Sequence, residues 1–173
     1  MRHYPTLLLI ILLVIGMTSC NLEGRADYTP VITISRQFCI YHADTTRLTD
    51  TLQVAYDAAQ EIDTIQTCHV GDTVTFLIGL FGTANNLLSF DMVYDSTIVT
   101  MLPLAASSTS GVLSSSTLEE GHYYMSFYPG ILAVTLQMQY IAIGTGTNTW
   151  NLLLNTDSEF SPRTYKLQQQ VRP

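Results

Sequence analysis

The stretch VGDTVTFLIGL, residues 70–80, decides the fold of this chain. A turn-forming Gly-Asp pair opens the stretch, and apolar side chains then recur at every second position, at Val74, Phe76, Ile78 and Leu80. Successive side chains of a β-strand point to opposite faces, so a period of two indicates a strand with one buried face. We therefore predict a strand whose four alternating apolar residues enter a hydrophobic core.

The period of two continues downstream. After a break at residues 82–86, we expect a second strand in which one face carries Leu88, Phe90, Met92 and Tyr94. The longest stripe runs over residues 132–140, and a Gly-rich turn leads from it to a strand that begins at Trp150, a residue expected in the core. Seven to nine short strands at hairpin-like spacing predict an all-β fold, an antiparallel two-sheet β-sandwich.

Two segments leave their secondary structure open. Apolar residues at helical spacing fit a short helix over residues 52–62, but residues 51–56 fit a strand equally well. The Ser/Thr-rich segment 105–117 fits either a loop or a weak edge hairpin.

The N-terminus has the pattern of a secretory leader. Arg2 and His3 precede an aliphatic run over residues 7–15, which is much shorter than the roughly 20 apolar residues of a membrane-spanning helix. The segment Met-Thr-Ser-Cys at residues 17–20 resembles the lipobox of bacterial lipoproteins, with methionine where that family prefers leucine. The resemblance implies that residues 1–19 are a removed signal peptide and that Cys20 becomes the lipidated first residue.

Lipidation would organise the rest of the chain. Bacterial lipoproteins carry several acyl chains such as palmitate on this cysteine, and stable anchoring requires two or more chains. Residues 20–29 would then be a tether and residues 30–173 a single β-sandwich domain. Asn21 is compatible with sorting to the outer membrane, so we expect a lipoprotein of the cell envelope. An ordinary signal peptide, cleaved or uncleaved, is the alternative.

The charge of the chain indicates which classes of partner to expect. The chain has 14 acidic and 7 basic side chains, a formal net charge of −7, and no basic stretch with interleaved aromatics. Such a chain repels phosphate backbones, so nucleic acid is not an expected partner. A membrane reached through the lipid anchor, and a protein or glycan at the cell surface, are the partners that we expect.

The central residues resemble cohesin-like modules. The segments VGDTVTF at residues 70–76 and LSFDMVYDSTIV at residues 88–99 are similar to two strands of that family, and residues 132–140 with the following glycines resemble a third. The resemblance implies an Ig-like or cohesin-like sandwich. Ser89 stands where the family usually has glycine, and residues 36–68 have no counterpart, so we carry over the architecture and not dockerin binding.

Catalytic motifs are missing from the sequence. It contains no His-Glu-x-x-His, Gly-x-Ser-x-Gly, phosphate-binding Gly-Lys-Ser/Thr or Cys-x-x-Cys pattern, so we expect no enzyme and assign no catalytic residue. Asp91 and Asp95 would share one strand face, either as a solvated surface and turn or as oxygen ligands for calcium, and we expect no other cofactor. Cys39 and Cys68 fit either a disulfide, which a secreted protein permits, or two buried thiols.

Aromatic residues offer a further candidate site. On the segment 122–128, Tyr124 and Tyr128 alternate with a second set of apolar residues, and one of these faces should be core. If the two tyrosines are exposed, their rings can stack on a sugar or a protein; otherwise they pack under a loop.

These observations favour a lipid-anchored, non-catalytic binding, adhesion or structural interaction module of the cell envelope. One alternative is a carbohydrate-binding accessory lipoprotein of a glycan-uptake system. The other is an envelope hydrolase that uses carboxylate chemistry.

Overall fold

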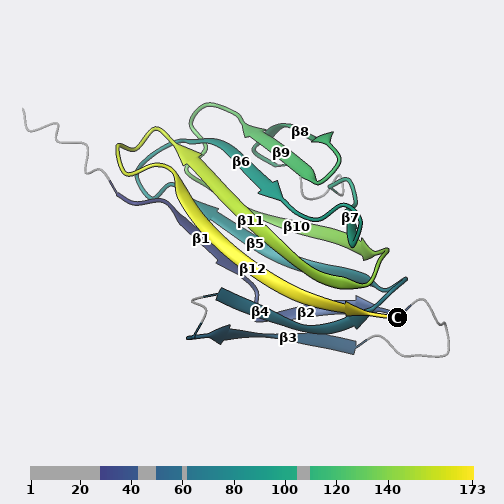
Figure 1. The fold of residues 1–173 in the computed structure, drawn as a ribbon. Coiled ribbons are helices and arrows are strands. Elements are labelled where there is room, and N and C mark those ends of the chain that lie inside the picture. The colour runs from purple at the N-terminus through teal and green to yellow at the C-terminus, as the bar shows by residue number, and fades with distance from the viewer. Residues whose placement is uncertain (1–27, 43–49, 60–61, 105–109) are drawn as a thin grey trace, which may run out of the picture.

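The computed structural model describes residues 28–42, 50–59, 62–104 and 110–173. These residues form twelve β-strands and no helix (Figure 1). In chain order the strands are β1 Val31–Ile34, β2 Gln37–Tyr41, β3 Asp50–Asp57, β4 Ile62–His69, β5 Thr73–Phe81, β6 Leu87–Val93, β7 Val99–Met101, β8 Val112–Glu119, β9 His122–Phe127, β10 Ala133–Ala142, β11 Gly146–Thr156 and β12 Arg163–Arg172. The described part of the chain contains no helix of the length and hydrophobicity needed to cross a membrane.

Hydrogen bonding joins the strands into one sheet in the order β7-β10-β5-β2-β3-β4-β12-β11-β6-β9-β8, with β1 also paired to β5. The sheet curls back on itself, so that β11 and β12 lie over β5 and β10 (Figure 1). We call β7, β10, β5, β1, β2 and the first half of β3 the first layer, and the second half of β3 through β8 the second layer. The predicted two-layer, all-β fold is confirmed.

Strand β3 connects the two layers. Its first half pairs with β2, where Thr51 lies opposite Cys39, and its second half pairs with β4, where Val54 lies opposite Ile65. All pairings are antiparallel except that of β12 with β4, which is parallel. The expectation of an antiparallel sandwich holds for all pairs except this one, at which the C-terminal strand β12 lies between β11 and β4.

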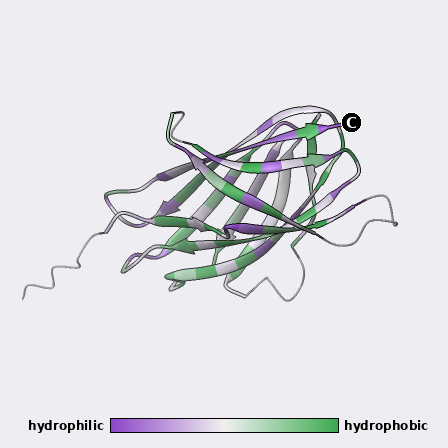
Figure 2. Ribbon diagram, turned by 90° about the horizontal axis from the view of Figure 1, so that it is seen from below, coloured by the Kyte–Doolittle hydropathy of each residue, from purple (hydrophilic) through white to green (hydrophobic). Residues whose placement is uncertain are grey.

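The core forms as the period of two predicts. Val74, Phe76, Ile78 and Leu80 are all buried, and so is Trp150. Apolar and polar positions alternate along the strands (Figure 2). Aromatic rings pack inside this core. Within the first layer the centroids of Phe38 and Phe76 are 4.8 Å apart and the rings are stacked. Between the layers the centroids of Tyr140 on β10 and Trp150 on β11 are 5.1 Å apart.

One predicted core position is wrong because of a β-bulge. Leu88 is 50% exposed, whereas Leu87 is buried. In the pairing of β6 with β11, Ser89 lies opposite Asn155 and Leu87 opposite Thr156, so Leu88 is the extra residue of the bulge. An inserted residue shifts the alternation by one position, which turns Leu87 inward and Leu88 outward.

The two open segments are both strands. In the segment 52–62 the described residues form no helix: β3 ends at Asp57, and β4 begins at Ile62. The edge hairpin is the correct alternative for residues 112–119, which form β8 and pair with β9; residues 105–109 lie outside the described residues. These strands, together with the short β1 and β7, raise the number above the expected seven to nine.

Candidate functional site: a groove on the second layer

Four neighbouring strands of the second layer build a row of outward-facing side chains. Val93 on β6 lies opposite His122 on β9 and opposite Asn151 on β11. Asn151 in turn lies opposite Lys166 on β12. Paired residues on adjacent strands project from the same face, so these side chains line up across the sheet.

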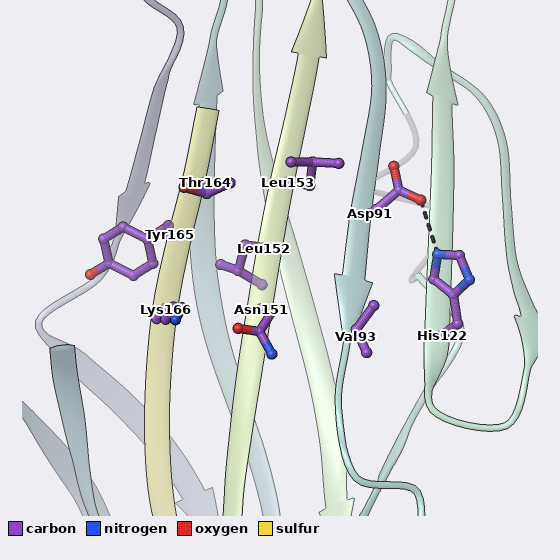
Figure 3. A pocket seen from close by; sticks show the side chains of 9 residues that line it. All are labelled: Asp91, Val93, His122, Asn151, Leu152, Leu153, Thr164, Tyr165 and Lys166. Carbon is purple, nitrogen blue, oxygen red and sulfur yellow. Dashed lines mark hydrogen bonds and ion pairs between the residues drawn. The ribbon is translucent and has the colours of Figure 1, made fainter. Parts of the chain in front are cut away.

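This row forms one side of a groove of about 360 Å³ (Figure 3). Its lining residues come from β6, β9, β11 and β12 and are Asp91, Val93, His122, Asn151, Leu152, Leu153, Thr164, Tyr165 and Lys166. Val93 is 48% exposed. Because the walls belong to paired strands and not to loops, the sheet holds the shape of the groove.

Asp91 and His122 form an ion pair or hydrogen bond at one side of the groove. The His122 Nε2 atom lies 2.9 Å from Asp91 Oδ1, and both side chains are largely shielded, with about a quarter or less of each exposed. The contact is diagonal, because Asp91 lies opposite Tyr124 and His122 lies opposite Val93. It links β6 to β9 beside the exposed Val93.

The chemistry of the groove is that of a binding surface. Val93 and Leu153 supply an apolar centre, Asp91 lies on one side, and Lys166 lies on the other (Figure 3). Asn151 and Thr164 add hydrogen-bonding groups along the lysine side. An apolar centre gives affinity, and a few placed polar groups give orientation, which is the usual organisation of a binding site.

The two aspartates for which the sequence leaves both a surface role and calcium binding open have separate partners. Asp91 pairs with His122, whereas Asp95 caps a turn, its Oδ1 accepting from the Thr97 backbone amide at 2.9 Å and from the Thr97 hydroxyl at 2.6 Å. These bonds, the hydroxyl's first, lower the pKa of Asp95. Among the described residues, no group of three or more His, Cys, Asp or Glu side chains is arranged to hold a metal ion.

The two candidate tyrosines lie on the outer side of β9, and neither lines the groove. Tyr124 is partly buried and lies opposite Asp91, and Tyr128 is 50% exposed just beyond the strand. The alternating residues Tyr123, Met125 and Phe127 are buried and form the core face.

The candidate disulfide between Cys39 and Cys68 is not formed. Both thiols are free, with Cys39 exposed and Cys68 buried. The cause is strand geometry: Cys39 projects from the outer face of the first layer, and Cys68 points into the core. Burial, with a contribution from the Asp72 carboxylate, raises the pKa of Cys68 to about 12.

A second polar cluster joins β2 to the β4–β5 turn. Asp72 is buried, and its two carboxylate oxygens contact His42 Nδ1 at 3.1 Å and accept from the His69 backbone amide at 2.8 Å. The Asp72 carbonyl also accepts from the Ala142 amide at 2.9 Å. These contacts tie three strand ends together and give Asp72 a structural role.

Sequence reasoning found Asp91 but missed its neighbours in the groove. His122, Asn151 and Lys166 are far from Asp91 in sequence, and only strand pairing brings them to one face. The available signal was the alternation itself, which marks each of them as outward-facing. Cys20, the predicted lipidation site, lies outside the described residues.

Solved structures with a similar β architecture have low sequence identity. The cohesin module of a family 33 glycoside hydrolase from Clostridium perfringens is 9% identical, with a TM-score of 0.41, and the match covers 80% of this chain and 100% of that chain. The C-terminal domain of the antigen I/II-family protein AspA from Streptococcus pyogenes is 13% identical, with a TM-score of 0.47, over 83% of this chain and 46% of that one. A DUF4466 family protein from Parabacteroides merdae is 12% identical, with a TM-score of 0.45, over 81% and 44%.

At these values the likenesses concern the β architecture alone and assign no partner to this chain. No protein-family model and no curated protein matches the sequence.

Proposed function

We propose that this chain is a non-catalytic interaction module of the cell envelope that binds a protein partner through the groove on the second layer. The observation that carries the proposal is the groove itself, in which the exposed Val93 lies between an acidic and a basic side. A partner segment with one apolar side chain fits the centre, and its flanking polar groups find Asp91 or Lys166. Aromatic and aliphatic anchors in such pockets dominate the affinity of protein interfaces.

The module is tethered through Cys20. The carbonyl of Tyr28, the first described residue, accepts from Ser158 Oγ at 2.9 Å and from Asn85 Nδ2 at 3.4 Å. These bonds hold the incoming chain at the end of the sandwich that carries the β5–β6 and β11–β12 turns. The eight residue steps from Cys20 to Tyr28 span at most about 28 Å when extended. This end therefore stays near the membrane, and the groove on the side of the sandwich stays accessible.

The anchor is tested separately from the groove. Intact mass of the protein isolated from cells should show cleavage before Cys20 and a multi-acyl addition. Cys20→Ser should move the protein from the membrane fraction to the soluble fraction. An unmodified Cys20 in membrane-isolated protein would contradict the tether and leave the groove proposal standing.

The groove is tested by crosslinking in intact cells followed by affinity capture. Val93→Lys places a charge at the apolar centre, and Val70→Lys is the matched control, because Val70 is a valine of similar exposure, 40%, outside the groove. A protein captured by the native chain and by Val70→Lys, but at least about tenfold less by Val93→Lys, supports the proposal. Equal capture by all three chains would show that the groove is not the binding surface.

Two other outcomes would replace the proposal with the alternatives. Binding on a glycan array that is lost in Val93→Lys would favour the carbohydrate-binding role. A hydrolytic activity of the purified protein that is lost in Asp91→Asn would favour the envelope hydrolase.

A further inference from the structure

Among the described strand residues, the outer face of the first layer carries no charged side chain. We define this uncharged face as the outward-facing residues of β1, β2, β5, β10 and β7 and of the first half of β3. In the described residues of these strands, every outward position is Thr, Gln, Val, Leu, Ile, Ala, Gly, Phe, Tyr or Cys. The corresponding face of the second layer includes Asp91, His122 and Lys166.

At the centre of the uncharged face, the surface is flat at Gly79 and raised at Leu77. A Cβ atom added to Gly79 would lie 2.6 Å from Phe81 Cε2 and 2.5 Å from Thr33 Oγ1, so the Phe81 ring lies across the glycine backbone. Two residues earlier on β5, Leu77 is 50% exposed and lies opposite Gln137.

Leu77 stands beside a hollow on the same face. The hollow has a volume of about 250 Å³, and its walls include Gln37, Cys39 and Gln137 as well as Leu77 itself. A raised apolar side chain next to a hollow is a self-complementary arrangement: in a twofold dimer, residue i of one copy meets residue j of the other, and the reverse holds at the same interface.

We propose that the uncharged face docks a second copy of this chain, with Leu77 of each copy entering the hollow of its partner. The distribution of charge favours a second copy of the chain as the partner at this face. The chain carries a net charge of −7, so two copies that meet through an acidic surface repel each other. The uncharged face adds no like-charge contact, and depletion of charged residues is the compositional mark of an interface core.

The area of the face matches that of a small dimer interface. It spans five strand positions, and its central strand β5 has nine residues. With strands about 4.8 Å apart and a rise of about 3.3 Å per residue, the face measures at most about 700 Å² per copy. The smaller specific interfaces bury about 600 Å² per partner, so a dimer of this kind uses nearly the whole face.

The test is the oligomeric state of the full chain as the cell processes it, measured by sedimentation equilibrium across a concentration series. Leu77→Lys places two charges in the interface of each dimer. Leu88→Lys is the matched control, because Leu88 has the same 50% exposure but lies on β6 in the second layer. We expect a dimer for the native chain and the control, and a dissociation constant at least about tenfold weaker for Leu77→Lys.

A second variant and a second readout guard against misfolding. Thr135→Lys changes an exposed residue opposite Gly79 and should weaken the dimer in the same direction. Alkylation of Cys39, followed at the peptide level by mass spectrometry, should slow as the native chain dimerises and stay fast in Leu77→Lys.

Three outcomes would overturn the proposal. The first is a monomer up to roughly 100 µM, and the second is a dimer that Leu77→Lys leaves unchanged. The third is a monomer whose binding to a neutral polysaccharide is lost in Leu77→Lys, which would assign the face to a glycan. None of them bears on the groove, which lies on the other layer.

Discussion

The hydroxyl of Tyr140 on β10 donates to Oε1 of Gln169 on β12 at 2.5 Å, inside the core between the two layers. The amide nitrogen of Gln169 donates in turn to the carbonyl of Gln66 on β4 at 2.9 Å. Both side chains are fully buried. Burial raises the pKa of Tyr140, so the phenol stays protonated and remains a donor. This chain of bonds fixes how the layers are placed against each other.

Removing the phenol should therefore destabilise the protein. Tyr140→Phe leaves the buried Gln169 oxygen without its donor, and an unsatisfied buried acceptor costs about 1–3 kcal/mol. We expect a fall of that size in the free energy of unfolding, measured by urea denaturation. Tyr123→Phe, in which the native ring is also buried, is the control for loss of a hydroxyl alone. Equal values for the two variants would contradict a special role for Tyr140.

The single tryptophan reports on the core. Trp150 is 1% exposed and contacts the Tyr140 ring. Its emission should be blue-shifted in the native protein, with weak quenching by acrylamide, and should move to the red in denaturant. A native spectrum that matches the denatured one would place Trp150 outside the core and contradict the layer packing.

The two described cysteines should differ sharply in reactivity. The thiolate is the reactive form, and burial raises the pKa of Cys68 to about 12, so at pH 8 this thiol stays protonated as well as shielded. Cys39 is exposed. Alkylation at pH 8, mapped by peptide mass spectrometry, should label Cys39 in the native protein and Cys68 only after denaturation. Recovery of a peptide pair linked through both cysteines would contradict the free thiols.

Gly144 should tolerate no side chain. A Cβ atom there would lie 2.1 Å from the carbonyl oxygen of Thr97, which is backbone and cannot rotate away. Gly144→Ala should lower the free energy of unfolding by about 1–3 kcal/mol, as overpacking does. Gly130→Ala is the comparison, because its Cβ would meet nothing within 4 Å and its cost is limited to the positive φ of 87°. That cost is about 1 kcal/mol. A smaller loss at Gly144 than at Gly130 would be inconsistent with the close approach.

The Asp95 turn should respond to acid. The Thr97 hydroxyl, and then its amide, lower the pKa of Asp95 below the ordinary value of a carboxyl. The folded pKa is the lower one, so this contribution to stability is present above the unfolded pKa and is lost as the pH falls through the folded pKa. An NMR titration of the Asp95 carboxyl carbon should show the low pKa, and Thr97→Val should raise it. An unchanged pKa in that variant would exclude the hydroxyl as its cause.

The parts of the fold that sequence reasoning predicted are those where alternation is unbroken. In residues 74–80 and 136–140 every second residue is apolar, and these alternating residues are in the core. Leu77 takes an outward position between them and is 50% exposed. Leu88 was misplaced because a bulge leaves the composition unchanged and shifts only the phase. The segment 52–62 fitted a helix and a strand equally well. Its first residues pair with β2, where Leu52 lies opposite Phe38, and residues 54–57 pair with β4. The local pattern does not show these pairings, which make the segment part of two strands.

The groove could be predicted from the sequence only in part. Each of its polar residues reads as an outward position on a separate strand, so the alternation predicts exposure. Asp91 and His122 become neighbours only through the pairing of β6 with β9, and the pairing of β6 with β11 adds Asn151 beside Val93. Register between distant strands depends on the whole curled sheet.

Because β3 pairs with β2 in the first layer and with β4 in the second, a continuous strand joins the two layers along one side of the sandwich. The outermost strands, β7 and β8, are the two free margins of the sheet. The layers should therefore separate most readily along the side opposite β3, where the register of β8 with β9 is irregular at two places. Mechanical pulling or protease attack should loosen this margin first, while β2, β3 and β4 remain together.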